Sequence, residues 1–276
     1  MTDADADRVA VYLDFDNIVI SRYDQINGRS SFQKDKAKGL KEDRLARATV
    51  DVGAIIDFAS SFGTLVLTRA YADWSSEVNN GYREQLVSRA VDLVQLFPAA
   101  AYGKNGADIR LAVDAVEDMF RLPDLTHVVI VAGDSDYIAL AQRCKRLGRY
   151  VVGVGVAGSS SRALAAACDD FVIYDALPGV PVPEPKTRAK PTGDEPPAPD
   201  AQAAATALLT RALRIGTEKD DVDWLHNSAV KAQMKRMDPS FSEKALGFKS
   251  FSDFLRSRSD LVELDESSTT RMVRLR

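Results

Sequence analysis

The sequence predicts an α/β fold with a mostly parallel sheet, followed by a second and smaller domain. Apolar runs without polar alternation, such as residues 126–132, are typical of strands that are buried on both faces of a sheet. Such runs alternate with helical patterns along residues 9–174, which is the order of βαβ units. Eight of the eleven prolines then fall between Pro178 and Pro199. We therefore expect a three-layer α/β/α domain, a semi-extended linker and a separate C-terminal domain.

Six strands and five helices are expected in the first domain. The strands are residues 9–13, 65–71, 92–97, 126–132, 150–156 and 171–174. The helices are residues 49–62, 78–89, 108–120, 138–147 and 158–168. Thr49 is expected to cap the first of these helices, and Gly63 is expected to end it. In the third helix one stripe is apolar, and we expect it to face the sheet. This stripe consists of Ile109, Ala112, Val113 and Val116.

The segment between the first strand and the first of these helices is polar and basic. It covers residues 21–47 and contains Lys34, Lys36, Lys38, Lys41, Arg44 and Arg47. This composition favours a solvated, mobile loop. Because the segment lies beside an acidic turn, a lobe that grips RNA is the alternative interpretation.

Composition narrows the class of protein. At 276 residues the chain is long enough for one large domain or two of ordinary size. A net charge of -4 gives no global signature of a nucleic-acid binder, so such contacts have to come from local patches. Cys144 and Cys168 lie on apolar helical faces, as core thiols do, and no Cys and His cluster has zinc-ligand spacing. The acidic N-terminus and the lack of a long apolar segment argue for a cytoplasmic protein without a membrane span.

Acidic residues follow several of the expected strands. Asp14-Phe15-Asp16-Asn17 follows the first strand, and Gly133-Asp134-Ser135-Asp136 follows the fourth. Ligands of parallel α/β sheets bind outside the carboxyl ends of the strands, so these acids are candidates for chemistry. Asp73 stands more weakly at the exit of the second strand. An Asp or Ser at such a turn is also a common helix N-cap, which is the structural alternative.

A third acidic element begins the helix that follows Lys104-Asn105-Gly106. It contains Asp108 and Asp114, which lie about 120° apart around a helix, so both cannot face one ion in the same way. We expect one of the two to support a metal ligand without binding the ion itself. Farther along, residues 158–161 carry three serines and either bind a phosphate or only cap a helix.

Carboxylates that converge without a histidine indicate a divalent cation. Two carboxylates about 4 Å apart repel by roughly 4 kcal/mol at an effective dielectric of 20, so the cluster needs protons or cations. The only histidines are His127, inside a buried strand, and His226 in the second domain. Oxygen ligands suit Mg²⁺ or Mn²⁺, and such ions assist the hydrolysis of phosphodiesters. The motifs therefore predict metal-dependent cleavage of a nucleic-acid strand.

In their order, the acidic motifs resemble the three signatures of the NYN domain, the LabA-like branch of the PIN-like nucleases. They are Asp14-Phe15-Asp16-Asn17, Lys104 with Asp108-Ile109 and Asp114, and Gly133-Asp134-Ser135-Asp136-Tyr137. Over about residues 8–177, the resemblance implies a PIN-like α/β/α fold and a ribonuclease site with Mg²⁺ or Mn²⁺. It implies that Asp14, Asp108, Asp134 and Asp136 bind metal, that Asn17 lines the site and that Lys104 contacts a phosphate. Ser135 and Ser159 complete the candidate substrate contacts.

The C-terminal segment resembles a second family. Helices at 202–214 and 222–237, a third helical stretch near Phe251 and a hairpin of 261–264 with 271–275 predict a winged helix. Its pattern resembles the OST-HTH, or LOTUS, domain, which implies an RNA surface or a surface for a protein partner. The pattern is Trp224-Leu225, Ser228, Asp238-Pro239-Ser240-Phe241, Gly247-Phe248 and Phe251-Ser252-Asp253-Phe254-Leu255. Lys231, Lys235 and Lys249 are candidate contacts, or simply solvated charges.

The expected organisation is therefore a nuclease domain at 1–177, a linker at 178–201 and a winged helix at 202–276. Nothing in the sequence specifies an oligomeric state. Two other functions remain open. An RNA-binding adaptor without activity would use the acids only as helix caps. A phosphatase of the haloacid dehalogenase type would use Asp14 as nucleophile and Asp16 as acid, with Thr68 and Lys104 as further parts of its site.

Overall fold

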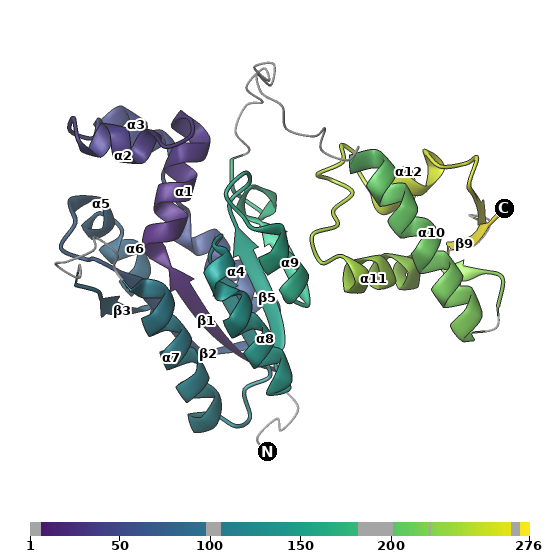
Figure 1. Cartoon of the computed structure of the whole chain (residues 1–276), viewed down its shortest axis with the longest axis horizontal. Helices are drawn as coiled ribbons and strands as arrows, with labels where there is room; N and C mark the ends of the chain where they lie inside the picture. Colours follow the sequence, from purple (N-terminus) through teal and green to yellow (C-terminus); the bar gives the residue numbers. More distant parts are fainter. Residues whose placement is uncertain (1–6, 98–105, 182–200, 221, 266–270) are drawn as a thin grey trace. The chain divides into compact units, whose positions relative to one another are not determined.

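The computed structural model describes residues 7–97, 106–181, 201–220, 222–265 and 271–276. The chain forms two compact units, Met1–Glu184 and Pro185–Arg276. Each unit is described by itself (Figure 1). Most of the expected linker lies outside the described residues. Leu177 and Val180 are buried in the first unit, so packed residues continue beyond the expected end at 177. The domain boundaries stay predictions.

The first unit contains a sheet of six parallel strands in the order β3-β2-β1-β4-β5-β6. Their bounds are β1 Arg8–Asp14, β2 Thr64–Ala72, β3 Asp92–Gln95, β4 His127–Val131, β5 Tyr150–Gly155 and β6 Asp170–Ile173. The expected α/β class with a parallel sheet is thus confirmed. Because β1 lies between β2 and β4, its carboxyl end is at the middle of the sheet edge.

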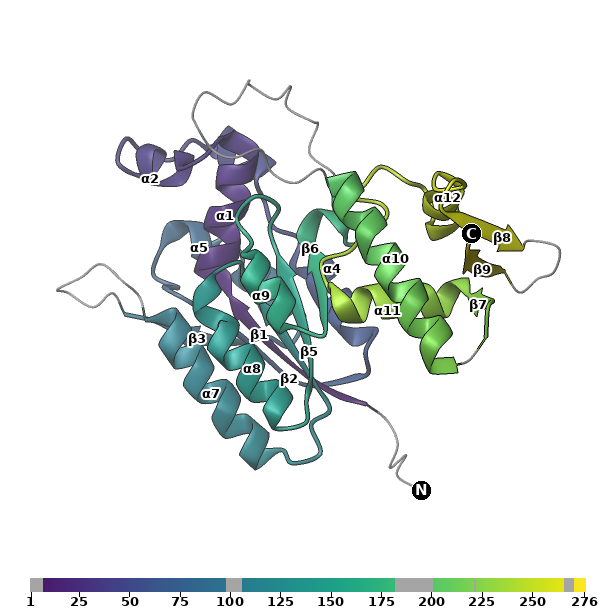
Figure 2. The ribbon, with the colours of Figure 1, turned by 45° about the vertical axis from the view of Figure 1, so that its right-hand side comes forward.

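Helices cover both faces of this sheet, which gives the three layers that the sequence predicts (Figures 1 and 2). One face packs against α1 Phe15–Asn27, α4 Val52–Ser60 and α6 Arg83–Val87. The other packs against α7 Ala107–Arg121, α8 Ile138–Arg146 and α9 Arg162–Ala167. Val9, Val11 and Leu13 of β1 face the first layer, whereas Ala10 and Tyr12 face the second. The apolar runs lack alternation because both faces of the strands are buried. Cys144 and Cys168 are buried free thiols, as expected.

The expected inner face of α7 is only partly correct. Ala112 and Val116 are half-buried against the core beneath the helix. Ile109 and Val113 have 69% and 58% of their surface exposed. Leu111, Ala115 and Met119 pack against the sheet instead. Both sets have helical spacing, so periodicity alone cannot choose between them. Tyrosines of the strands donate hydrogen bonds to acidic side chains on the buried face of α7. A sequence pattern assigns such carboxylates to the solvent face instead.

Other helix boundaries also differ from expectation. The helix expected at 158–168 is shorter, since α9 begins at Arg162. The N-cap of α4 is Asp51, whose carboxylate accepts from the Ala54 backbone N–H at 3.0 Å. Thr49 lies just beyond the preceding helix, and its hydroxyl donates to the Ala46 carbonyl oxygen of that helix at 2.9 Å. The helix expected at 78–89 is divided into α5 Glu77–Asn80 and α6 Arg83–Val87, with Gly81 between them.

The basic segment at residues 21–47 is helical, so its interpretation as a mobile loop is wrong. It contains the end of α1, then α2 Ser31–Lys36 and α3 Glu42–Arg47. Residues 28–48, here called the basic arm, lie at the far end of α1 from the sheet (Figures 1 and 2). Phe32 is buried against Tyr23, with ring centroids 5.4 Å apart. This small apolar cluster anchors the arm. The lysine-rich composition of the segment gives no sign of it.

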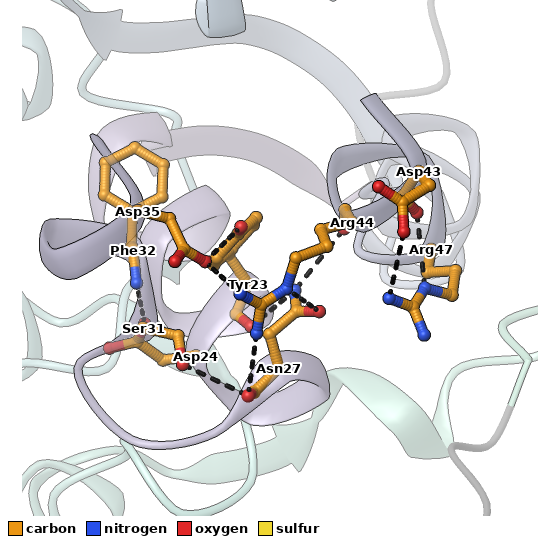
Figure 3. Close-up of polar contacts among 9 residues, drawn as sticks. All are labelled: Tyr23, Asp24, Asn27, Ser31, Phe32, Asp35, Asp43, Arg44 and Arg47. Atoms are coloured by element: carbon orange, nitrogen blue, oxygen red, sulfur yellow. Dashed lines mark hydrogen bonds and ion pairs between the residues drawn. The ribbon is translucent and has the colours of Figure 1, made fainter. Parts of the chain in front are cut away.

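Three charged residues fix the arm to α1 (Figure 3). Asp24 accepts from the backbone N–H groups of Ser30 and Phe32, at 3.0 and 2.7 Å. Asp35 accepts from the Tyr23 hydroxyl at 2.7 Å and pairs with the guanidinium of Arg44. Arg44 also donates to the Asn27 carbonyl oxygen at 3.2 Å. The arm is therefore a folded part of the domain.

Replacing Asp35 by alanine is expected to release the arm locally. The change removes the acceptor of Tyr23 and the partner of Arg44, which corresponds to about 1–2 kcal/mol of local stability. Tryptic cleavage within residues 29–47 should then accelerate by about ten-fold, with little change in the global melting temperature. The matched control is Asp43→Ala, whose pair with Arg47 is exposed (Figure 3). Equal cleavage rates in the two variants would show that Asp35 does not hold the arm.

The second unit has the helices and the wing of a winged helix. Its elements are α10 Ala201–Asp220, β7 Leu225–His226, α11 Asn227–Met237, α12 Phe251–Arg256, β8 Val262–Asp265 and β9 Met272–Leu275. The expected hairpin is confirmed as the antiparallel pair β8 and β9. The helix expected from 222 begins at Asn227, because β7 pairs with β9. Lys231 forms a 2.6 Å ion pair with the buried Glu243, so this lysine has a structural partner.

Candidate functional site

A cleft of about 510 Å³ opens at the carboxyl edge of the sheet. Six aspartates from four separate turns line it: Asp14, Asp16, Asp73, Asp108, Asp134 and Asp136. The four acids expected to bind metal are thus brought together, along with two that the sequence marks only weakly. The convergence follows from the parallel sheet, which places the ends of β1, β2 and β4 side by side.

Asp14 is the buried acid of the cleft, with 7% of its surface exposed. It is the N-cap of α1 and accepts from the Asn17 backbone N–H at 3.2 Å. The Tyr137 hydroxyl donates to its other oxygen at 2.7 Å. Burial raises the pKa of Asp14 from its ordinary value of 3.8 to about 6. The two hydrogen bonds lower this pKa, and the charges of Asp16 and Asp108 raise it.

Asn17 joins the two central turns. Its side-chain oxygen accepts from the Gly133 backbone N–H at 3.0 Å. A contact between residues 116 positions apart thereby holds the end of β4 against the start of α1. Asn17 lines the cleft as expected, and its carbonyl oxygen serves this structural bond.

Asp134 and Asp136 are exposed at the rim of the cleft. Asp134 is the N-cap of the short helix η1 Ser135–Tyr137, and its carboxylate accepts from the Asp136 N–H at 3.3 Å. The Ser135 hydroxyl donates to the same oxygen at 3.3 Å. Ser135 itself does not line the cleft. The helix-cap interpretation therefore holds for Asp14 and Asp134, and both still face the cleft.

Asp108 enters the cleft from the first turn of α7. The helix begins after Gly106, whose φ of 60° is a left-handed conformation that glycine adopts readily. A carboxylate in the first turn is stabilised by the helix dipole. Lys104 lies outside the described residues. Asp114 is directed elsewhere, because it accepts from the Tyr71 hydroxyl at 3.1 Å and pairs with Arg110.

Asn79 positions the remaining two acids, and sequence reasoning missed it. Its side-chain amide donates to Asp16 at 2.6 Å and to the Asp73 carbonyl oxygen at 2.9 Å. Asn79 is buried on the short helix α5 and lines the cleft. The Ser75 hydroxyl is the main cause that lowers the pKa of Asp73, and burial opposes this effect. The only signal in the sequence was that a second polar turn, which contains Asn79, follows six residues after Asp73.

Comparison with known proteins supports what this geometry indicates. Residues 8–175 match the NYN domain, and residues 199–274 match the OST-HTH/LOTUS domain. The first match covers more than half of the chain. This chain belongs to the NYN-domain family. NYN domains are part of a nuclease superfamily, and an OST-HTH/LOTUS domain indicates RNA binding. The resemblance that the acidic motifs carry is thus confirmed.

Two individual proteins are also similar to this NYN protein. An uncharacterized protein of Methanocaldococcus jannaschii, MJ0482, is 28% identical over 120 residues. The match covers 44% of this chain and 46% of that protein, so it spans less than half of the relative's length. The crystal structure of a protein of unknown function, VPA0982 from Vibrio parahaemolyticus RIMD 2210633, is 21% identical with a TM-score of 0.45. That match covers 64% of this chain and 97% of the other.

The serine-rich turn of the NYN domain acts mainly as a helix cap. Ser161 is the N-cap of α9, and its backbone N–H donates to the Gly133 carbonyl oxygen at 2.9 Å. The N–H groups of Ser159 and Ser160 both donate to the Val156 carbonyl oxygen. These amides are therefore engaged within the protein. Ser159 is exposed next to Gly133 but does not line the cleft, so its contact with substrate stays a prediction.

The donor chemistry of the NYN cleft fits a hard cation, because its acidic groups are all carboxylates. Within the residues that the structure describes, no three Asp, Glu, His or Cys side chains are grouped so that they could hold a metal ion. An ion that keeps several of its waters, as Mg²⁺ does, fits this spread of acids better than one in a closed cage.

The described helices include none with the length and apolarity that a membrane crossing requires.

Proposed function

We propose that this NYN protein is a divalent-metal-dependent ribonuclease that hydrolyses RNA phosphodiester bonds. The observation that carries the proposal is the convergence of six aspartates, one of them buried, on a single cleft. The charges of Asp16 and Asp108 raise the pKa of Asp14, and a cation in the cleft would relieve this repulsion. An open cleft at the carboxyl edge of the sheet also gives an extended strand access to these groups.

The residues of the cleft have distinct roles in this proposal. Asp14, Asp108, Asp134 and Asp136 would hold Mg²⁺ or Mn²⁺. When bound, the ion supplies Lewis-acid activation of water and of the scissile phosphodiester. Tyr137 and Asn17 hold the Asp14 and Asp134 turns in place through their hydrogen bonds. Asp16 and Asp73, oriented by Asn79, support the cluster from the β2 side.

The second domain would recruit RNA or a protein partner. A tethered module raises the effective concentration of its ligand near the cleft. Lys231, Lys235 and Lys249 are the candidate contacts, and Lys231 also pairs with Glu243. The buried free thiols are consistent with the reducing cytoplasmic location that the proposal assumes.

The structure disfavours the phosphatase alternative. That chemistry needs a Ser or Thr at the end of a second strand. Thr68 is instead buried within β2, four residues before its end, and it does not line the cleft. The convergence of Asp108 on the same cleft also has no role in such a phosphatase.

Cleavage of labelled single-stranded RNA tests the proposal. Wild-type protein in Mg²⁺ or Mn²⁺ should give products, and EDTA or Asp134→Asn should abolish them. The matched control is Asp124→Asn, because Asp124 is exposed and precedes β4 at the opposite edge of the sheet. Turnover of para-nitrophenyl phosphate with intact RNA would indicate a phosphatase. RNA binding without either reaction would indicate an adaptor.

A further inference from the structure

The basic arm forms one side of the acidic cleft. Phe32, Gln33 and Lys36 of α2 line the cleft together with the aspartates. Among the lining residues that the structure describes, Lys36 is the only cation, facing six carboxylates. It is exposed and therefore accessible to a ligand in the cleft.

The arm holds Lys36 at a defined place. The N-terminus of α2 is fixed by Asp24, and its last turn by the contacts of Asp35 with Tyr23 and Arg44 (Figure 3). Phe32, one helical turn before Lys36, is buried against Tyr23. Lys36 thus stands on a folded support, so a contact it makes requires little ordering of the backbone.

The charge of the arm is opposite to that of the cleft. Residues 28–48 contain seven basic and three acidic residues, whereas the whole chain has a net charge of -4. The field of Lys36 reaches one acid of the cleft, since it contributes to the lowered pKa of Asp73 after the larger effects of Ser75 and Gln95. An RNA backbone that approaches six carboxylates is repelled, so a cation at the rim has a clear electrostatic use.

We propose that Lys36 is a substrate-positioning residue that binds a backbone phosphate of single-stranded RNA beside the acidic cleft. The arm is then the wall along which the strand lies. The inference rests on the proposed ribonuclease function, and it names the contact by which that site recognises RNA. The lysine ammonium binds phosphate as a point charge, so the contact is independent of base sequence.

The test compares Lys36→Ala with Lys34→Ala, because both lysines are exposed on α2 and only Lys36 lines the cleft. For cleavage of single-stranded RNA, Lys36→Ala should raise KM by about five-fold and leave kcat nearly unchanged. The slope of log(kcat/KM) against log salt should become less steep by about 0.7. Lys36→Arg should restore KM, and Lys34→Ala should resemble wild type.

Equal KM values and equal salt slopes for Lys36→Ala and Lys34→Ala would overturn the inference. A wild-type protein that cleaves no RNA would refute the proposed function instead. In that case fluorescence anisotropy of the labelled RNA with each variant still decides the role of Lys36. Weaker binding by Lys36→Ala than by Lys34→Ala would support it, and equal binding would exclude it.

Discussion

Replacing Asp14 by asparagine is expected to abolish cleavage of RNA and, at the same time, to stabilise the fold. The loss of activity should be about 100-fold or more, because the variant lacks the buried carboxylate at the centre of the proposed metal site. Asparagine has nearly the same shape and keeps one oxygen that can accept from Asn17 or Tyr137. The geometry of the two turns should therefore survive the change.

The gain in stability follows from the raised pKa of Asp14. Its pKa is 3.8 in ordinary surroundings and about 6 in the folded protein, so the folded state binds the proton more tightly than the unfolded state. The wild-type free energy of unfolding consequently falls as the pH rises from about 4 to about 6. The difference in pKa corresponds to about 3 kcal/mol as an upper bound. Asp14→Asn has no carboxylate to ionise and avoids this loss.

Thermal unfolding in EDTA at several pH values measures the effect. The variant and wild type should melt together near pH 4, and the variant should melt at a higher temperature above pH 6. A constant difference across this range would show that another group, not Asp14, is responsible. A stable, active Asp14→Asn protein would remove Asp14 from the site.

Asp118→Asn is expected to do the opposite, with a loss of stability and little change in the chemistry of the cleft. Asp118 has 4% of its surface exposed, accepts from the Tyr12 hydroxyl at 3.1 Å and pairs with Arg69. Removing the charge leaves a half-buried guanidinium without its counter-ion. Such a change lowers the free energy of unfolding by about 2–4 kcal/mol, with the partial exposure of Arg69 reducing the effect.

Urea unfolding provides the measurement, with Asp57→Asn as the matched control. Asp57 also pairs with an arginine, Arg89, but both side chains are well exposed, so its loss should amount to 1 kcal/mol or less. Equal midpoints for the two variants would mean that the buried pair contributes no more than a surface pair. Folded Asp118→Asn protein should retain wild-type cleavage per molecule.

The acids of the cleft were predictable because strand direction follows from simple features. Buried apolar runs mark the strands, and parallel connections bring their carboxyl ends to one edge. Asp14, Asp108 and Asp134 could therefore be grouped although they are far apart in the chain. The partners that position them could not be, since the Tyr137 hydroxyl reaches Asp14 across 123 residues. Nothing local in the sequence specifies such a bond.

The faces of helices were harder to predict than their existence. In α7, Ile109 and Val113 of the expected inner stripe lie in solvent, while Asp114 and Asp118 lie beneath tyrosines of the sheet. Hydrophobic periodicity assumes that charged groups are outside, and buried hydrogen-bonded acids break this assumption. The basic arm was wrongly expected to be a mobile loop for the same reason. Its anchors are Phe32 and a few buried polar bonds, which a lysine-rich segment does not reveal.

Because β1 lies between β2 and β4, the proposed active cleft can form only after both of these strands have been synthesised. Its first residue bonds to Thr126, 118 positions later, and Asp14 meets Tyr137 only once β4 has been added alongside. A growing chain that ends before β4 carries Asp14, Asp73 and Asp108 but has no assembled cleft. Because such long-range pairings form late, the cleft of the proposed nuclease cannot assemble until β4 has left the ribosome.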